Sequence, residues 1–169
     1  MTLIIGIDPG QSGGIAWWTT DIGMSVTPMP ETERDIYDTL SHLFELGYEY
    51  DSGLKFAYLE QVHSMPKQGV ASTFKFGMNY GFLRACLMGN GMPFETVTPQ
   101  KWQKALGCLS KGDKNVTKRK AQELFPHNKV THKTADALLI CEYGRRLRSN
   151  LLKEASLPTK KSTGATRAG

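Results

Sequence analysis

The chain has 169 residues, which is the length of one domain with a sizeable core. Its net charge of +5 is unevenly divided, because residues 1–100 carry a net −6 and residues 101–169 a net +11, and this asymmetry suggests a polyanionic partner. No apolar run approaches the roughly 20 residues of a membrane span, no charged-then-apolar leader precedes the first predicted strand, and three scattered cysteines exclude a disulfide framework. We therefore expect a cytoplasmic protein with buried thiols and no membrane contact.

Short apolar runs predict five strands. The most continuous run, in residues 2–8, is typical of a strand that is buried on both faces in the middle of a sheet. The first three strands follow one another through short links, which indicates an antiparallel meander. The predicted strands cover residues 2–8, 15–18, 24–27, 54–60 and 94–97.

Apolar residues at helical spacing predict the helices. These cover residues 31–46, 71–88, a short segment from Pro99, about 113–125, and 132–148. In the helix 71–88, Phe74, Met78, Phe82 and Ala85 form an apolar stripe that we expect to face the core. Beyond residue 152 the chain is rich in Ser, Thr, Lys and Gly and has no aromatic residue, so we expect one domain, residues 1–152, and a basic disordered tail, residues 153–169.

Three acids are predicted to meet at one edge of this sheet. A right-handed strand–helix–strand return places strand 54–60 parallel to strand 2–8, so that Asp8 and Glu60 end neighbouring strands at the edge where open sheets place their sites. Asp136 lies near the start of the last predicted helix, toward the core. Carboxylates without Arg or Lys partners are costly there and suit Mg²⁺ or Mn²⁺, and two such ions can promote phosphodiester hydrolysis.

Three motifs on these elements resemble the RuvC family of Holliday-junction resolvases, which has the RNase H-like fold. They are Ile7-Asp8-Pro9-Gly10, Leu59-Glu60-Gln61-Val62 and Ala135-Asp136-Ala137-Leu138, in this order. The helix Ser72 to Leu87 and the segment Val97 to Trp102 are similar to the small phage and organellar members. The resemblance covers about residues 3–148. It implies an α/β RNase H-like domain whose five-stranded mixed sheet has three antiparallel strands, then two parallel strands, and flanking helices.

The resemblance also implies an activity, that of a crossover junction endodeoxyribonuclease in DNA recombination and repair. Such a homodimer binds a four-way DNA junction, and each subunit nicks one strand with a water activated by Mg²⁺ or Mn²⁺, two ions per site. The setting would be the cytoplasm of a bacterial or phage-infected cell.

The resemblance implies a catalytic metal site at Asp8, Glu60 and Asp136, which match three of the family's four positions. The fourth position, an acid or a His in the family, is Lys133 here. Lys stays protonated to about pH 10 and has no lone pair to give. His132, four residues before Asp136, can share its helical face, and we expect it to be the fourth catalytic and metal-binding residue.

Residues on three segments are expected to contact DNA or a second subunit. His63 stands where the family has an aromatic residue that contacts junction bases, and Phe76 follows it. The helix with Phe74, Phe76, Gly77, Asn79 and Gly81 is a candidate for part of the dimer contact. The predicted phosphate contacts are Lys101, Lys104, Lys111, Lys114, Lys118 and Arg119.

The first motif and the three acids are also found in, or compatible with, proteins of other functions. Actin-like and sugar-kinase ATPases also open with Gly-Ile-Asp-x-Gly, but they enclose a nucleotide between two such domains, and this chain supplies one, so we expect no nucleotide cofactor. A general branched-DNA debranching nuclease or an RNase H-type nuclease stays open. A non-catalytic junction-binding protein is disfavoured by the three intact acids.

Overall fold

The structure is a computed structural model that describes residues 2–48, 53–62 and 69–155. Its sheet has the strand order β3-β2-β1-β4-β5, in which β1, β2 and β3 are antiparallel and β4 and β5 run parallel to β1. The predicted five-stranded mixed α/β sheet is therefore confirmed. The strands are β1 (Leu3–Asp8), β2 (Gly14–Thr19), β3 (Gly23–Pro28), β4 (Lys55–Glu60) and β5 (Phe94–Val97).

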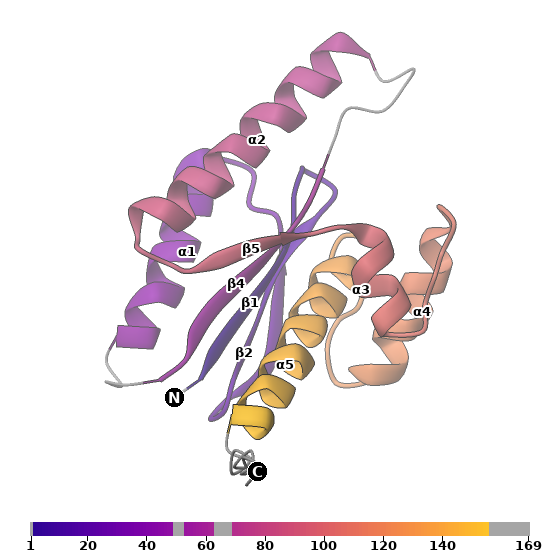
Figure 1. The fold of residues 1–169 in the computed structure, drawn as a ribbon. Coiled ribbons are helices and arrows are strands. Elements are labelled where there is room, and N and C mark those ends of the chain that lie inside the picture. Colours follow the sequence, from indigo (N-terminus) through magenta and orange to yellow (C-terminus); the bar gives the residue numbers. More distant parts are fainter. Residues whose placement is uncertain (1, 49–52, 63–68, 156–169) are drawn as a thin grey trace, which may run out of the picture.

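In the described part of the chain, five helices cover the sheet in two layers, α1 and α2 on one face and α3, α4 and α5 on the other (Figure 1). They are α1 (Glu33–Tyr48), α2 (Val70–Gly89), α3 (Pro99–Ala105), α4 (Lys114–Leu124) and α5 (Ala135–Ala155). With helices on both faces, β1 is buried throughout its apolar run, as its sequence predicted. No helix in the described ranges is both long enough and apolar enough to span a membrane.

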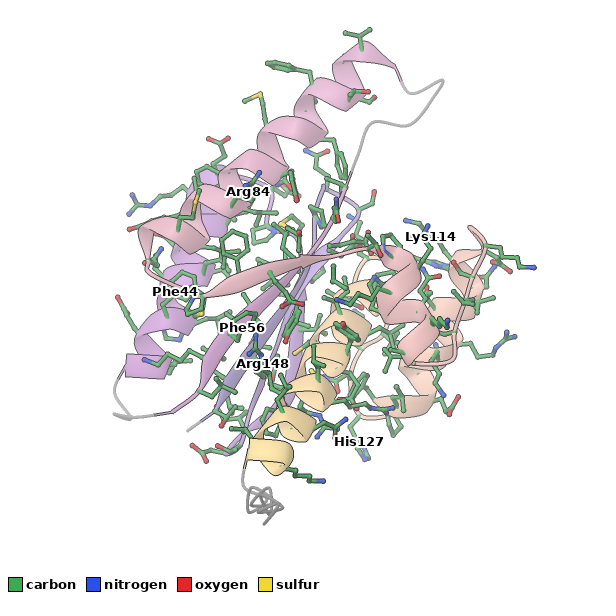
Figure 2. All side chains as sticks on the ribbon, viewed as in Figure 1. Phe44, Phe56, Arg84, Lys114, His127 and Arg148 are labelled. Carbon is green, nitrogen blue, oxygen red and sulfur yellow. The ribbon has the colours of Figure 1, made fainter. Side chains whose placement is uncertain are left out.

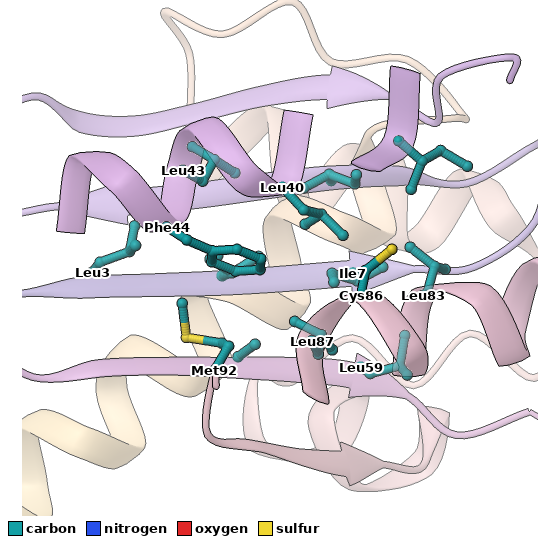
Figure 3. Packing of buried hydrophobic residues seen from close by; sticks show 14 of the residues in the cluster. Leu3, Ile7, Leu40, Leu43, Phe44, Leu59, Leu83, Cys86, Leu87 and Met92 are labelled. Atoms are coloured by element: carbon teal, nitrogen blue, oxygen red, sulfur yellow. The ribbon is translucent and has the colours of Figure 1, made fainter. Parts of the chain in front are cut away.

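One core lies between the sheet and the helices α1 and α2 (Figure 3). Side chains of α1 and α2 there face the apolar residues of β1 and β4, and burial of each such side chain contributes roughly 1.5–3 kcal/mol. The residues labelled in Figure 3 are Leu3, Ile7, Leu40, Leu43, Phe44, Leu59, Leu83, Cys86, Leu87 and Met92. This layer fixes β1 and β4 from one side.

The opposite face of β1 is held by α5 at very short range. A Cβ built on Gly6 would lie 2.2 Å from the backbone nitrogen of Cys141, so only glycine lets helix and strand approach this closely. Gly144, one turn further along α5, meets the Tyr58 ring in the same way, with 2.2 Å to its Cδ2. These two contacts set the distance between α5 and the sheet, and with it the position of the first turn of α5.

Three predicted features differ from the structure at helix ends and on α2. The helix α1 starts at Glu33 because the Thr32 hydroxyl accepts from the Asp35 N–H (3.1 Å) and donates to its carboxylate (2.7 Å), a reciprocal cap. The helix α5 starts at Ala135 rather than at residue 132, and it continues to Ala155, so residues 153–155 of the expected tail are helical. The rest of that tail, residues 156–169, lies outside the described residues.

The predicted core stripe of α2 is the third difference, because of its four residues only Phe82, which is half-buried, packs against the core. Phe74 and Met78 are exposed, at 68% and 51%, and Ala85 is exposed as well, whereas Leu83, Cys86 and Leu87 are the buried residues of this helix. The first turns of α2 extend beyond the sheet (Figure 1), and the residues of α2 that belong to or pack against the core begin at Tyr80. The expectation for Cys86, Cys108 and Cys141 is confirmed, because all three are buried free thiols.

Candidate active site

Asp8 is the last residue of β1, and the turn that follows wraps around it. Gly10 adopts φ +95°, a conformation that favours glycine, and its N–H donates to Asn79 Oδ1 of α2 at 2.7 Å. A Cβ on Gly13 would lie 2.1 Å from the Asp8 carbonyl oxygen and 3.0 Å from its Cγ. The small residues of this turn therefore leave room for the carboxylate at the strand end.

Glu60 is the last residue of β4, and it lies beside Asp8 because Ile7 of β1 is in register with Leu59 of the parallel β4. On the other side Glu60 is in register with Val97 of β5. The helix α3 starts at Pro99, and its fourth residue, Trp102, donates its indole N–H to Glu60 Oε2 at 2.8 Å. The predicted meeting of Asp8 and Glu60 at one sheet edge is confirmed.

Asp136 comes to this edge in the first turn of α5. The turn before it is held by Thr131 and Thr134, whose side chains bond each other and the backbone between residues 129 and 134. Asp136 Oδ1 is buried and has no hydrogen-bond partner in the described part of the chain. A buried carboxylate oxygen without a partner is costly. The described part of the chain therefore leaves the hydrogen-bonding capacity of the Asp136 carboxylate incompletely used.

The electrostatics tie the three acids together. Burial, followed by the charges of Glu60 and Asp136, raises the pKa of Asp8 well above its ordinary value. Burial raises the pKa of Glu60 to about 7; the charge of Asp136 adds to this, and the hydrogen bond from Trp102 opposes it. Burial also raises the pKa of Asp136, against lowering by Thr117, Lys114 and His132.

Lys114, the first residue of α4, is the positive charge that these acids share. It lowers the pKa of Asp8, Glu60 and Asp136 alike, yet the pKa of each stays raised, so one exposed ammonium does not offset their burial. Figure 2 shows Lys114 on the α3–α4 side of the molecule.

The donor chemistry of this edge fits a hard divalent cation. Three carboxylates, one of which has a buried oxygen without a hydrogen-bond partner, offer the ligands that Mg²⁺ and Mn²⁺ prefer. Within the described ranges, however, no three His, Cys, Asp or Glu side chains lie close enough together to form a complete metal-binding group. The acids thus share one electrostatic environment without forming a closed coordination sphere.

The expected fourth metal position falls in the turn before α5 and not on the helix itself. His132 and Lys133 are both exposed there. The charge of His132 lowers the pKa of Asp136, which places the imidazole within electrostatic reach of that acid. The main chain of Lys133 packs against β2, since a Cβ on Gly14 would lie 2.8 Å from the Lys133 carbonyl oxygen.

The predicted DNA-contacting residues are only partly brought together. Lys101, Lys104, Lys111, Lys114 and Arg119 are exposed on α3, α4 and the loop between them, Lys118 is half-buried on α4, and Lys101 also forms a long ion pair with Glu95 (3.9 Å). The ring of Phe76 covers Gly10, with Cε2 2.7 Å from where a Cβ would stand, so it supports the Asp8 turn. His63 lies outside the described residues.

The mixed five-stranded sheet and its flanking helices have the RNase H-like fold. The particular structures that the chain resembles include Thermus thermophilus RuvC (16% identity, TM-score 0.57, covering 87% of this chain and 97% of that chain) and T. thermophilus RuvC in complex with a Holliday junction substrate (16%, 0.55, 87% and 96%). The yeast mitochondrial Holliday junction resolvase Ydc2 gives a TM-score of 0.45 at 14% identity, over 89% of this chain and 82% of that chain. No family model and no curated protein matches the sequence. The resemblance to RuvC-like resolvases is thus confirmed in the fold.

Two polar residues at the site were not singled out from the sequence. Trp102 reads as an ordinary aromatic of a short helix, and Thr117 as a small residue of a lysine-rich one. Both come to the acids only through tertiary packing of α3 and α4. The one signal that could have pointed to Trp102 is its place five residues after the end of β5, the strand that pairs with Glu60.

The raised pKa of Glu60 predicts a stability that falls with pH. Between its ordinary value of 4.5 and about 7, folded Glu60 keeps a proton that the unfolded chain has lost, so the free energy of unfolding decreases as the pH rises through this window. Glu60→Gln removes that titration. Without divalent ions it should exceed the parent in unfolding free energy by on the order of 1–3 kcal/mol at pH 8 and by much less at pH 5, measured by urea denaturation.

The control for this experiment is Glu45→Gln, which changes an exposed acid of α1. It should leave the difference between the two pH values as it is in the parent. If the excess in unfolding free energy of Glu60→Gln over the parent were no larger at pH 8 than at pH 5, the pKa of Glu60 would not be raised.

Proposed function

We propose that this protein is a metal-dependent endodeoxyribonuclease that binds four-way DNA junctions and resolves them by paired nicks. The observation that carries the proposal is the group of three acids with raised pKa values, one with an orphaned oxygen, at the carboxyl ends of β1 and β4. The fold supports it, because it is shared with a RuvC whose structure contains a Holliday junction substrate.

The chain's own residues divide the work by charge. Asp8, Glu60 and Asp136 would hold Mg²⁺ or Mn²⁺, which when bound supplies Lewis-acid activation of a water and of the scissile phosphate. Lys114 would contact a phosphate beside them, a role supported by the effect of its charge on the pKa of all three acids. The remaining exposed cations of α3 and α4 would position the DNA backbone.

The experiment is metal-dependent cleavage of a synthetic four-way junction with mapped nicks. Asp8→Asn, Glu60→Gln and Asp136→Asn should each reduce the nicking rate by roughly a hundredfold or more while junction binding stays intact, because removal of a negative charge does not weaken contact with phosphate. Gel-shift binding and single-turnover cleavage measure the two effects. The matched control, Asp21→Asn in the exposed turn between β2 and β3, should cleave as the parent does.

The outcomes separate the alternatives. Parental cleavage by any of the three variants would remove that acid from the site. Cleavage of flaps or of an RNA–DNA hybrid in preference to the junction would favour a debranching or RNase H-type nuclease. Tight junction binding without any nicking, in Mg²⁺ and in Mn²⁺, would leave a non-catalytic binding protein.

His132 is proposed as the fourth group beside the metal. Its charge reaches Asp136, and its neutral imidazole has a lone pair, whereas the exposed ammonium of Lys133 has none. His132→Ala should lose most of the cleavage rate at unchanged junction affinity, and Lys133→Ala should retain the rate. A His132→Ala variant that cleaves at the parental rate in both metals would leave three protein ligands.

The working unit is proposed to be a twofold dimer, since two symmetric nicks need two sites. The outer face of α2 supports this, because it exposes an apolar stripe with two glycines that have nothing within 4 Å. Phe76 and Asn79, which the sequence also suggested for the contact, instead face the Gly10 turn. The stripe consists of Val70, Phe74, Gly77, Met78, Gly81, Ala85 and Met88.

Phe74→Asp should therefore convert a dimer into a monomer, because it places a charge in the middle of the stripe. Sedimentation velocity at micromolar concentration measures this. Ile22→Asp is the control, since Ile22 is equally exposed, at 67%, but lies in the turn between β2 and β3. A parent protein that is monomeric and fully active would contradict the dimer, and a Phe74→Asp variant that stays dimeric would place the contact elsewhere.

A further inference from the structure

Trp102 is the largest fully buried side chain of the described residues, and its one polar atom points at the candidate site. Indole nitrogen is a donor only, and here it donates to Glu60 Oε2 at 2.8 Å. Leaving that N–H unpaired in the core would cost about 1–3 kcal/mol. The bond therefore joins a rigid core residue to a carboxylate at the sheet edge.

The backbone around both partners fixes the direction of this bond. Glu60 and Val97 are paired in the sheet, and the Gln61 N–H donates to the Val97 carbonyl at 2.8 Å. Pro99 then starts α3, with Thr98 as its N-cap. The Trp102 ring packs in the core against α5 residues such as Leu138, so neither its position nor the direction of its N–H depends on the solvent.

We infer that Trp102 is a positioning residue that fixes one oxygen of Glu60 and leaves the other oxygen to face the reaction site. The inference rests on the proposed function and adds to it the device that aims Glu60. With Oε2 engaged by the indole, Oε1 would be the oxygen that Glu60 offers to a cation. Partners of this kind, which orient a metal-binding side chain, are typically worth 10–100-fold in metal affinity or activity.

Two replacements test the bond at nearly constant packing. Trp102→Phe removes the N–H together with part of the ring, and benzothienylalanine at position 102 exchanges the N–H for sulfur at nearly the same volume. Both should raise the half-saturating Mn²⁺ concentration tenfold or more in calorimetry of the full chain without DNA, lower the single-turnover rate by a similar factor, and change the junction Kd less than twofold.

A structural role would look different. Loss of folded protein lowers the amount of Mn²⁺ bound, but it does not change the half-saturating concentration of the molecules that remain folded. Trp18→Phe is the control, because it removes the indole N–H of a half-buried Trp on β2. The ring of Trp18 lies under the guanidinium of Arg145 of α5, away from the three acids. It should leave the Mn²⁺ affinity as in the parent.

A double-variant cycle shows whether Trp102 acts through Glu60. In the Glu60→Ala background, which removes the acceptor of the indole N–H, Trp102→Phe should change the Mn²⁺ affinity no further. Parental Mn²⁺ affinity and rate in the benzothienylalanine protein, or a full additional loss in the Glu60→Ala background, would overturn the inference. A parent protein that binds Mn²⁺ with Trp102-dependent affinity but cleaves no junction would instead overturn the proposed function and keep the positioning role.

Discussion

The parallel pairing of β1 with β4 is the constraint on which the rest of the site depends. Because both strands run the same way and are in register, their last residues, Asp8 and Glu60, must end side by side at one edge. Gly6 then lets α5 lie directly on β1, within 2.2 Å of a would-be Cβ, and this contact brings Asp136 to the same edge. Strand direction and helix distance thus bring the three acids into one electrostatic environment at this edge.

This arrangement of three acids costs free energy on folding, and it is the reason why we propose that a cation binds here. Each acid loses solvent without gaining a full ionic partner, so the folded chain stores an unfavourable charge arrangement that a divalent ion would relieve. The surrounding core offsets the cost, since apolar layers cover both faces of the sheet. By contrast, Glu142 is buried but held between Arg145 and Arg146 at 2.7 Å, which lowers its pKa, and this acid needs no further partner.

The sequence predicted what depends on local pattern and strand order. The five strands, their mixed topology, and the meeting of Asp8 with Glu60 follow from apolar runs and from the handedness of the β–α–β connection. Phe74, Met78 and Ala85 of α2 were wrongly assigned to the core, because apolar residues at helical spacing look the same whether or not a sheet covers them. Thr117 could not be found, and Trp102 only by its place shortly after β5, since α3 and α4 reach the acids through packing that no local period encodes.

We propose that the acids at this edge bind a cation. The most direct test is calorimetry of Mn²⁺ binding to the DNA-free protein near pH 6.5. Two buffers of different ionisation enthalpy are compared, so that the number of protons released on binding is measured as well. Because the pKa of Glu60 is about 7, the account predicts saturable binding with release of protons to the buffer, and loss of both in Asp136→Asn. No saturable binding at millimolar Mn²⁺, or binding that Asp136→Asn leaves unchanged, would contradict it.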